Sequence, residues 1–402
     1  MKIYLVGGAV RDKILGIPIK DRDYLVVGSS PEEMIKLGYK PIGKNFPVFL
    51  HPKTNEEYAL ARTEKKVGKG YHGFEFFTSP SVTLEEDLMR RDITINAIAE
   101  DENGNIYDPY NGVEDIEKKV IRHVSDAFTE DPLRVFRVAR FFARLEGFEI
   151  HKDTQELMKK MVSSGEIASL SIERILTEIL KGLDERYADK MFLSFSDSGV
   201  LKSIFPDFVE KNLSPPNLGL SNSIYSLLIE LRNTPNSIAA ESKLLMILAL
   251  PFFSNQVKPT SKNYLEYFKL SNHAKIIFKG IKYEASNLEN FLSLSIEDQL
   301  DSLYRLDFFR RPNVTFEILE MVMFIIPVSF KVIPSSQSIE EVEVQANKKR
   351  VHKKIAIVKN TIVLFSQEYF KLKTKIDPLK TPEEIKKFIY KERISVLKKV
   401  SS

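Results

Sequence analysis

The sequence predicts an α+β N-terminal part followed by an all-α C-terminal part. Two observations support this division. Short β-branched runs separated by glycine and proline fill residues 1 to about 120, at 23–28, 46–52, 56–63 and 103–110. From about residue 130 onward, apolar residues recur at helical spacing, at 130–145, 154–162, 171–183, 187–205 and 296–309.

Length and composition restrict the class of protein. With 402 residues, 43% of them hydrophobic, the chain is long enough to form two or more domains. It has no cysteine, which excludes disulfides and thiolate metal sites and suits a reducing cytoplasm, where we expect the protein. The apolar run after Met1 lacks the features of a signal peptide. The apolar stretch 316–333 contains two glutamates and a proline, so we expect a buried helix there and no membrane partner.

Two linkers are predicted, at 207–223 and 333–350, because both stretches are rich in turn-forming or charged residues. The net charge of +4 is too small to indicate a nucleic-acid partner by itself. Residues 348–354 and the end of the chain from Lys371 onward are locally basic. These segments are predicted to be solvated helix faces or RNA contacts.

Two aspartates stand one residue apart in the run KDRDYLVVG, at Asp21 and Asp23. In a strand both side chains would point to the same face. Because like charges repel, a fold keeps such a pair chiefly around a cation, and oxygen-only ligands favour Mg²⁺. Upstream, Gly7 and Gly8 permit a close backbone approach, and the helix that follows offers N–H groups to an anion such as phosphate. A turn or a helix cap is the alternative for either motif alone.

The run RRDITINA joins two guanidinium groups to a carboxylate and an amide. Arg90 and Arg91 have the fork geometry that suits triphosphate oxygens. Asp92 and Asn96 could bind ribose hydroxyls or orient the arginines. A surface salt-bridge cluster is an equally good interpretation of this run alone.

The segment EDPLRVFRVARFFARL predicts an amphipathic helix with Asp131 as its N-cap and Pro132 as its first residue. One flank carries arginines, at Arg134, Arg137, Arg140 and Arg144. The opposite flank is apolar, and Leu133 and Phe141 fit neither flank. No acid follows the cap, which favours an anionic ligand over a solvated surface stripe.

Six ordered motifs together resemble one family. They are LVGGAVRD, KDRD, RRDITINA, DPYNG, EDPLRVFRVARF and SIERILTE. The set resembles the class II tRNA nucleotidyltransferases, or CCA-adding enzymes, of the polymerase-beta-like nucleotidyltransferase superfamily, and its spacing is similar to the gamma-proteobacterial form. The resemblance covers the first half of the chain. It implies a catalytic head at 1–125, a helical neck that recognises the base at 126–206, and a helical body and tail at 207–402.

The resemblance also implies roles for individual residues. They are Gly7, Gly8 and Arg11 for the phosphate-holding turn, Asp21 and Asp23 for magnesium, Arg91 and Asp92 for phosphates and ribose, Asp131 and Arg134 for the base, and Arg137 and Arg140 for the rest of the nucleotide-binding helix. Glu57 is a candidate third catalytic acid, with a sheet-edge residue as the equal alternative. The implied reaction is template-independent addition of CCA to tRNA from CTP and ATP, with Mg²⁺ as cofactor and release of pyrophosphate.

An Asp–Arg pair can select cytosine and adenine on physical grounds. Both bases present an amino donor beside a ring-nitrogen acceptor, so a carboxylate and a guanidinium match them. Uracil and guanine reverse this pattern. In the family, a flexible loop helps the switch from C to A, and the corresponding interval here, residues 64–86, keeps Gly68, Gly70 and Gly73. This argues against an enzyme limited to CC addition.

The second half departs from the family pattern. Gamma-proteobacterial relatives usually carry an HD phosphohydrolase site, yet none of the six histidines is followed by aspartate. We therefore expect no phosphohydrolase activity, and residues 241–253 as the remnant of a helix that once carried such a site. The C-terminal half is expected to bind the acceptor and TΨC arms of tRNA. We expect a monomer, with a dimer as the alternative.

Two other functions stay open at this point. A poly(A) polymerase shares the head and uses ATP alone, but it usually has a longer leader and a strongly basic tail. A catalytically silent tRNA-binding protein is the second alternative. Intact Asp21, Asp23, Arg91, Asp131 and Arg134 argue against it.

Overall fold

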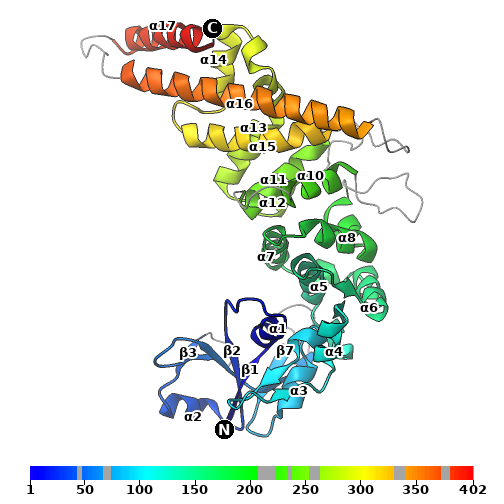
Figure 1. Cartoon of the computed structure of the whole chain (residues 1–402). Coiled ribbons are helices and arrows are strands. Elements are labelled where there is room, and N and C mark those ends of the chain that lie inside the picture. Colours follow the sequence, from blue (N-terminus) through cyan, green and yellow to red (C-terminus); the bar gives the residue numbers. More distant parts are fainter. Residues whose placement is uncertain are drawn as a thin grey trace. The chain divides into compact units, whose positions relative to one another are not determined.

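The computed structural model divides the chain into two compact units, Met1–Pro206 and Asp207–Ser402 (Figure 1). It describes residues 1–42, 48–66, 74–206, 222–232, 238–252, 263–329, 340–372 and 381–401. The first unit is α+β and every element described in the second is helical, which confirms the predicted fold class. Residues 207–221 and 330–339, which make up much of the two predicted linkers, lie outside the described residues, as do Gly68, Gly70 and Gly73. The finer division of the first unit at residue 125 stays a prediction.

Seven strands of the first unit form one mixed sheet in the order β3-β4-β5-β2-β1-β8-β9. These strands are β1 Lys2–Val6, β2 Asp23–Val27, β3 Lys40–Ile42, β4 Val48–Leu50, β5 Glu57–Leu60, β8 Ala99–Glu100 and β9 Ile106–Tyr107. Two smaller ladders pair β6 Arg62–Lys66 with β7 Phe74–Thr78, and β10 Val120–Ile121 with β11 Glu149–Ile150. The predicted run 103–110 therefore supplies only a two-residue strand, because a turn and Pro109 flank it.

The strand register brings the first two motifs to one edge of the sheet. Antiparallel pairing sets Val6, the last residue of β1, opposite Asp23, the first residue of β2. Gly7 and Gly8 follow directly, so they lie beside the aspartate. Further along β2, Leu25 joins one apolar cluster and Val26 the other, which confirms the expected alternation of faces.

Helices cover this sheet and continue beyond it within the first unit. The α-helices are α1 Gly8–Ile14, α2 Pro31–Lys36, α3 Leu84–Met89, α4 Gly112–Glu117, α5 Leu133–Arg144, α6 Lys152–Ser163, α7 Ile172–Leu183, α8 Ala188–Ser198 and α9 Val200–Ile204. Helix α5 packs on both α7 and α8. The single helix expected over 187–205 is two helices, because Gly199 adopts a left-handed φ of 84° and ends α8.

The second unit is helical. Its described α-helices are α10 Asn222–Arg232, α11 Ala240–Ala249, α12 Tyr264–Tyr267, α13 Asn272–Glu289, α14 Ile296–Arg305, α15 Pro312–Ser329, α16 Glu340–Leu372 and α17 Pro382–Ser401. Four of them, α13, α15, α16 and α17, are longer than any described helix of the first unit. Helix α13 packs on α15, and α16 packs on α15 and α17. The expected buried helix within 316–333 is α15, where Ile318, Val322 and Ile325 have no exposed surface. No described helix is both long and apolar enough to cross a membrane.

Candidate active site

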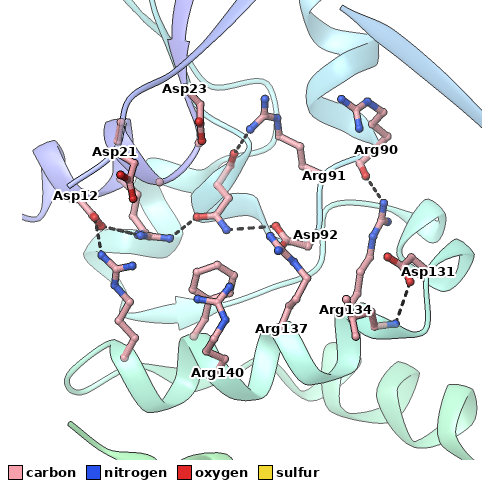
Figure 2. Close-up of a pocket in the computed structure, with 18 of the residues that line it drawn as sticks. Asp12, Asp21, Asp23, Arg90, Arg91, Asp92, Asp131, Arg134, Arg137 and Arg140 are labelled. Atoms are coloured by element: carbon pink, nitrogen blue, oxygen red, sulfur yellow. Dashed lines mark hydrogen bonds and ion pairs between the residues drawn. The ribbon is translucent and has the colours of Figure 1, made fainter. Parts of the chain in front are cut away.

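A polar cavity of about 580 Å³ lies within the first unit and collects the sequence motifs (Figure 2). Its volume falls in the range that encloses small-molecule ligands. The lining residues are Gly7, Gly8, Ala9, Arg11, Asp12, Lys20, Asp21, Asp23, Arg62, Arg90, Arg91, Asp92, Asn96, Asp131, Leu133, Arg134, Arg137, Arg140, Phe141, Arg144 and Arg174. Every predicted site residue except Glu57 is in this set, so the structure brings together motifs that are up to 133 residues apart, from Gly7 to Arg140.

Asp21 and Asp23 both line the cavity, one before and one at the start of β2 (Figure 2). Burial raises the pKa of Asp23, the Arg91 charge lowers it, and the Asp21 charge raises it further, with a net upward shift. Neither carboxylate forms a hydrogen bond or ion pair within the described part of the chain. A bound cation would relieve the repulsion between them.

The donor set fits a magnesium ion. Mg²⁺ is commonly bound by one or two carboxylates together with water and substrate phosphates, rather than by a cage of protein ligands. Asp21 and Asp23 supply two such carboxylates, and the described residues contain no cluster of three or more His, Cys, Asp or Glu suited to a metal. Glu57 pairs with Asp23 across β2 and β5, but its side chain is exposed and does not line the cavity. Its role as a third acid stays a prediction.

The glycine pair makes room for arginine side chains. Gly7 has a φ of +73°, and a Cβ there would lie 2.9 Å from Arg91 Nη1. A Cβ at Gly8 would lie 3.3 Å from Arg11 Nη2. The two glycines therefore allow guanidinium groups to pack against the backbone between β1 and α1.

Arg11 forms part of the cavity wall, and its guanidinium is already bound to neighbouring side chains. Only 1% of its surface is exposed, and its guanidinium donates to Asp12 Oδ1 and to Asn96 Oδ1. Burial lowers the pKa of Arg11 despite the Asp12 charge. The other oxygen of Asp12 accepts from Arg144 Nη2 at 2.7 Å, so Asp12 ties α1 to α5.

The two arginines of the RRD motif share one acid, and its aspartate pairs with an arginine of α5. Arg90 and Arg91 pair with the buried Asp87, at 2.7 and 3.4 Å. Asp92 is buried and pairs with Arg137 Nη2 at 2.6 Å, while its other oxygen accepts from Ile93 N. Burial alone would raise the pKa of Asp92, but the Arg137 charge and the hydrogen bonds lower it to about 2. Asp92 is therefore ionised at neutral pH.

The arginine flank of α5 faces the cavity as expected, but it is not free of acids. Carboxylates distant in sequence neutralise three of its members, in the pairs Arg137–Asp92, Arg140–Glu178 and Arg144–Asp12. The absence of acids on α5 itself therefore did not predict how many of its arginines lack an ion pair. The two residues that fitted neither flank, Leu133 and Phe141, also line the cavity, and the Arg140 guanidinium lies 4.5 Å from the centre of the Phe141 ring.

The predicted base-reading pair is held by neighbouring groups. Helix α5 begins at Leu133, one residue later than expected, because Pro132 occupies the N-cap position. Asp131 still accepts from Leu133 N, and its second oxygen pairs with Arg174 Nη2 at 2.9 Å. The Nη atoms of Arg134 donate to the carbonyl oxygens of Ala127 and Arg90, each at 2.6 Å.

Four charged lining residues were not predicted to belong to the site: Asp12, Lys20, Arg62 and Arg174. Asp12, Lys20 and Arg174 stand inside the motifs LVGGAVRD, KDRD and SIERILTE, respectively. Their position in these motifs could therefore have indicated that they belong to the site. Arg62 lies outside those motifs; it is the first residue of β6, its backbone N–H donates to Asp87 Oδ1, and its carbonyl oxygen accepts from Arg90 Nε.

Comparisons with known proteins agree with this geometry. Residues 3–122 match the poly A polymerase head domain family, and residues 147–211 match the family described as the probable RNA and SrmB-binding site of polymerase A. Over 207 residues, the chain is 59% identical to a multifunctional CCA protein of Methylobacillus flagellatus and 58% identical to that of Chromobacterium violaceum. These matches cover 52% of this chain and 50% and 51% of the relatives, so the chain matches about half the length of its curated relatives.

Solved structures extend the fold over both units. The Bacillus stearothermophilus CCA-adding enzyme in complex with CTP aligns with a TM-score of 0.59 and 23% identity, over 98% of this chain and 88% of that one. The Thermotoga maritima CCA-adding enzyme complexed with tRNA aligns with a TM-score of 0.62 and 20% identity, over 99% and 90%. At this identity the likeness establishes the fold. Residues 3–122 are therefore similar to the poly A polymerase head domain family, and the similarity of the first half of the chain to multifunctional CCA proteins confirms the predicted resemblance to class II CCA-adding enzymes.

Proposed function

We propose that this protein adds and repairs the 3′-terminal CCA of tRNA, transferring nucleotides from CTP and ATP and releasing pyrophosphate. The observation that carries the proposal is the unpaired couple Asp21 and Asp23 in a cavity whose opposite wall is the arginine flank of α5 (Figure 2). Two oxygen ligands facing a cationic wall suit a metal-bound triphosphate. Relatives over the same residues are named multifunctional CCA proteins.

Asp21 and Asp23 would hold Mg²⁺ in this proposal. When bound, the ions would lower the pKa of the tRNA 3′-hydroxyl and stabilise charge on the reacting phosphate. Arg91 and the arginines of α5 would orient the triphosphate, and Asp92 would fix the position of Arg137 through their ion pair. The residues 147–211, which match a probable RNA-binding family, and the helical second unit would bind the tRNA.

A single assay separates the candidate functions. The full chain is incubated with tRNA that lacks its terminal CCA, Mg²⁺ and each labelled nucleoside triphosphate. We expect two C residues, then one A, then arrest. Incorporation of A alone, in long tails, would instead favour a poly(A) polymerase. A chain that binds tRNA but incorporates nothing would be a silent tRNA-binding protein.

Replacing Arg134 by alanine should relax base selection. We propose that Asp131 accepts a hydrogen bond from the base and that Arg134 donates one to it. Removing the guanidinium of Arg134 therefore takes away the group that disfavours uracil and guanine. An unsatisfied buried partner costs about 1–3 kcal/mol, so misincorporation of UTP and GTP relative to CTP and ATP should rise about tenfold or more. The measurement is the ratio of kcat/KM values for the four nucleotides.

Because Arg134 also supports two carbonyl groups, the thermal unfolding of the variant is measured in parallel. Arg134→Lys keeps a donor and provides the matched comparison. Continued exclusion of UTP and GTP by a folded Arg134→Ala variant would contradict the base-reading role.

A further inference from the structure

Almost all the cationic side chains that line the cavity already form an ion pair or a hydrogen bond with another residue of the chain. The pairs are Arg11 and Arg144 with Asp12, Arg90 and Arg91 with Asp87, Arg137 with Asp92, Arg140 with Glu178, and Arg174 with Asp131. Arg134 donates to carbonyl oxygens, and Arg62 is also engaged. Lys20 is the exception: in the described part of the chain it has neither a hydrogen bond nor an ion pair. The cavity thus holds one uncommitted ammonium group beside its two uncommitted carboxylates.

Lys20 has a defined position at the cavity. It directly precedes Asp21 in the chain, its side chain is exposed, and it lines the same cavity as both aspartates. Its charge acts on the half-buried Glu185, as do the charges of Arg144 and Arg140, without forming an ion pair. Lys20 therefore lies where the metal-binding edge of the sheet approaches the arginine flank of α5.

We propose that Lys20 binds the β- and γ-phosphates of the incoming nucleotide and neutralises the pyrophosphate that leaves, an assignment that rests on the proposed nucleotidyl transfer. In that step, the 3′-oxygen of the tRNA forms a bond to the α-phosphorus. The bond from that phosphorus to the bridging oxygen breaks, its electron pair leaves with pyrophosphate, and the hydroxyl proton passes to water. Negative charge therefore accumulates on the departing group.

An uncommitted ammonium suits this task better than the paired arginines do. A phosphate that bound Arg137, Arg140 or Arg144 would compete with a carboxylate already within 2.7 Å. Lys20 has no such competitor, and lysine is a compact, mobile point charge that can follow a departing anion. The contact would be to phosphates shared by CTP and ATP, so it would bind both nucleotides without selecting between them.

The test uses the full chain with Lys20→Ala and the charge-conserving Lys20→Arg. Lys53→Ala is the matched control, because Lys53 is an exposed lysine of the same unit that does not line the cavity. Lys20→Ala should raise the KM for CTP and for ATP about tenfold each, and should raise the inhibition constant of pyrophosphate similarly. Lys20→Arg should stay within about threefold of the unmodified chain, and tRNA affinity should not change in any variant.

The affinity for inorganic tripolyphosphate in the presence of Mg²⁺, measured by calorimetry, tests the role of Lys20 separately from turnover. We expect about tenfold weaker binding by Lys20→Ala and no change with Lys53→Ala. Equal tripolyphosphate and nucleotide affinities in Lys20→Ala and the unmodified chain would overturn the assignment, as would failure of the unmodified chain to bind tripolyphosphate. A chain that binds tripolyphosphate through Lys20 but incorporates no nucleotide would refute the proposed reaction and leave the phosphate site standing.

Discussion

Replacing Asp23 by alanine should abolish nucleotide incorporation, with a loss of about a thousandfold or more, and should leave tRNA affinity unchanged. Asp23 is one of only two uncommitted carboxylates in the described part of the cavity, and burial together with Asp21 already disfavours its ionised state without a cation. Removing it leaves a single carboxylate to bind divalent ions. The measurement is the rate of labelled CTP incorporation into truncated tRNA across a Mg²⁺ titration.

Two further variants make this result interpretable. Glu102→Gln changes an exposed acid of the same unit outside the cavity and should retain full activity. Glu57→Gln should lower the rate by less than about tenfold, because Glu57 neighbours Asp23 in the sheet but does not line the cavity. A loss at Glu57 as large as that at Asp23 would assign Glu57 to the metal site. Normal turnover by Asp23→Ala would contradict the metal role of the aspartates.

The sequence predicted the lining of the cavity more completely than it predicted the interactions between the lining residues. The D-x-D spacing, the glycine pair and the arginine flank each depend on residues within a few positions of one another, and local periodicity is enough to find them. Even the two residues that broke the pattern of α5, Leu133 and Phe141, were informative. They are apolar residues on the arginine side because that side forms the wall of a cavity.

The partners of the arginines could not be predicted because they come from other elements. Asp12, Asp92 and Glu178 lie 132, 45 and 38 residues from the arginines that they pair with on α5. Only tertiary packing brings these pairs together, and a single sequence does not show which distant residues come into contact. The charge of a helix face was therefore predicted correctly, whereas the charge available to a ligand was not. The same reasoning singles out Lys20, whose uncommitted state is visible only after the other pairs are known.

The predicted helix boundaries were wrong where the backbone conformation of a single residue ends or starts a helix. Gly199 divides one expected helix because it alone adopts the left-handed conformation between α8 and α9. Pro132 moves the start of α5 by one residue, yet Asp131 keeps its hydrogen bond to the first turn. In the second unit, helical periodicity predicted the class of structure, but the sequence there offered no motif from which a site could be built.

Replacing Asp92 by alanine should destabilise the first unit by roughly 2 to 3 kcal/mol at pH 7 and weaken nucleotide binding. Asp92 is buried, and it joins the RRD motif to α5 through Arg137. The shift of its pKa from 3.8 to about 2 corresponds to about 2 kcal/mol of stability at neutral pH. The loss of hydrogen bonds from Ile93 N and Asn96 Nδ2 adds to this cost.

The pH dependence provides the decisive check. Because folding lowers the pKa of Asp92, its contribution is fully present above the unfolded value near 4 and is lost as pH falls toward about 2. The difference in unfolding free energy between the unmodified chain and Asp92→Ala should therefore be constant from pH 7 to pH 5 and should narrow below pH 4. Calorimetric unfolding over this range measures it, with Glu102→Gln as the exposed control. A difference that is independent of pH would mean that packing, and not the ion pair with Arg137, accounts for the role of Asp92.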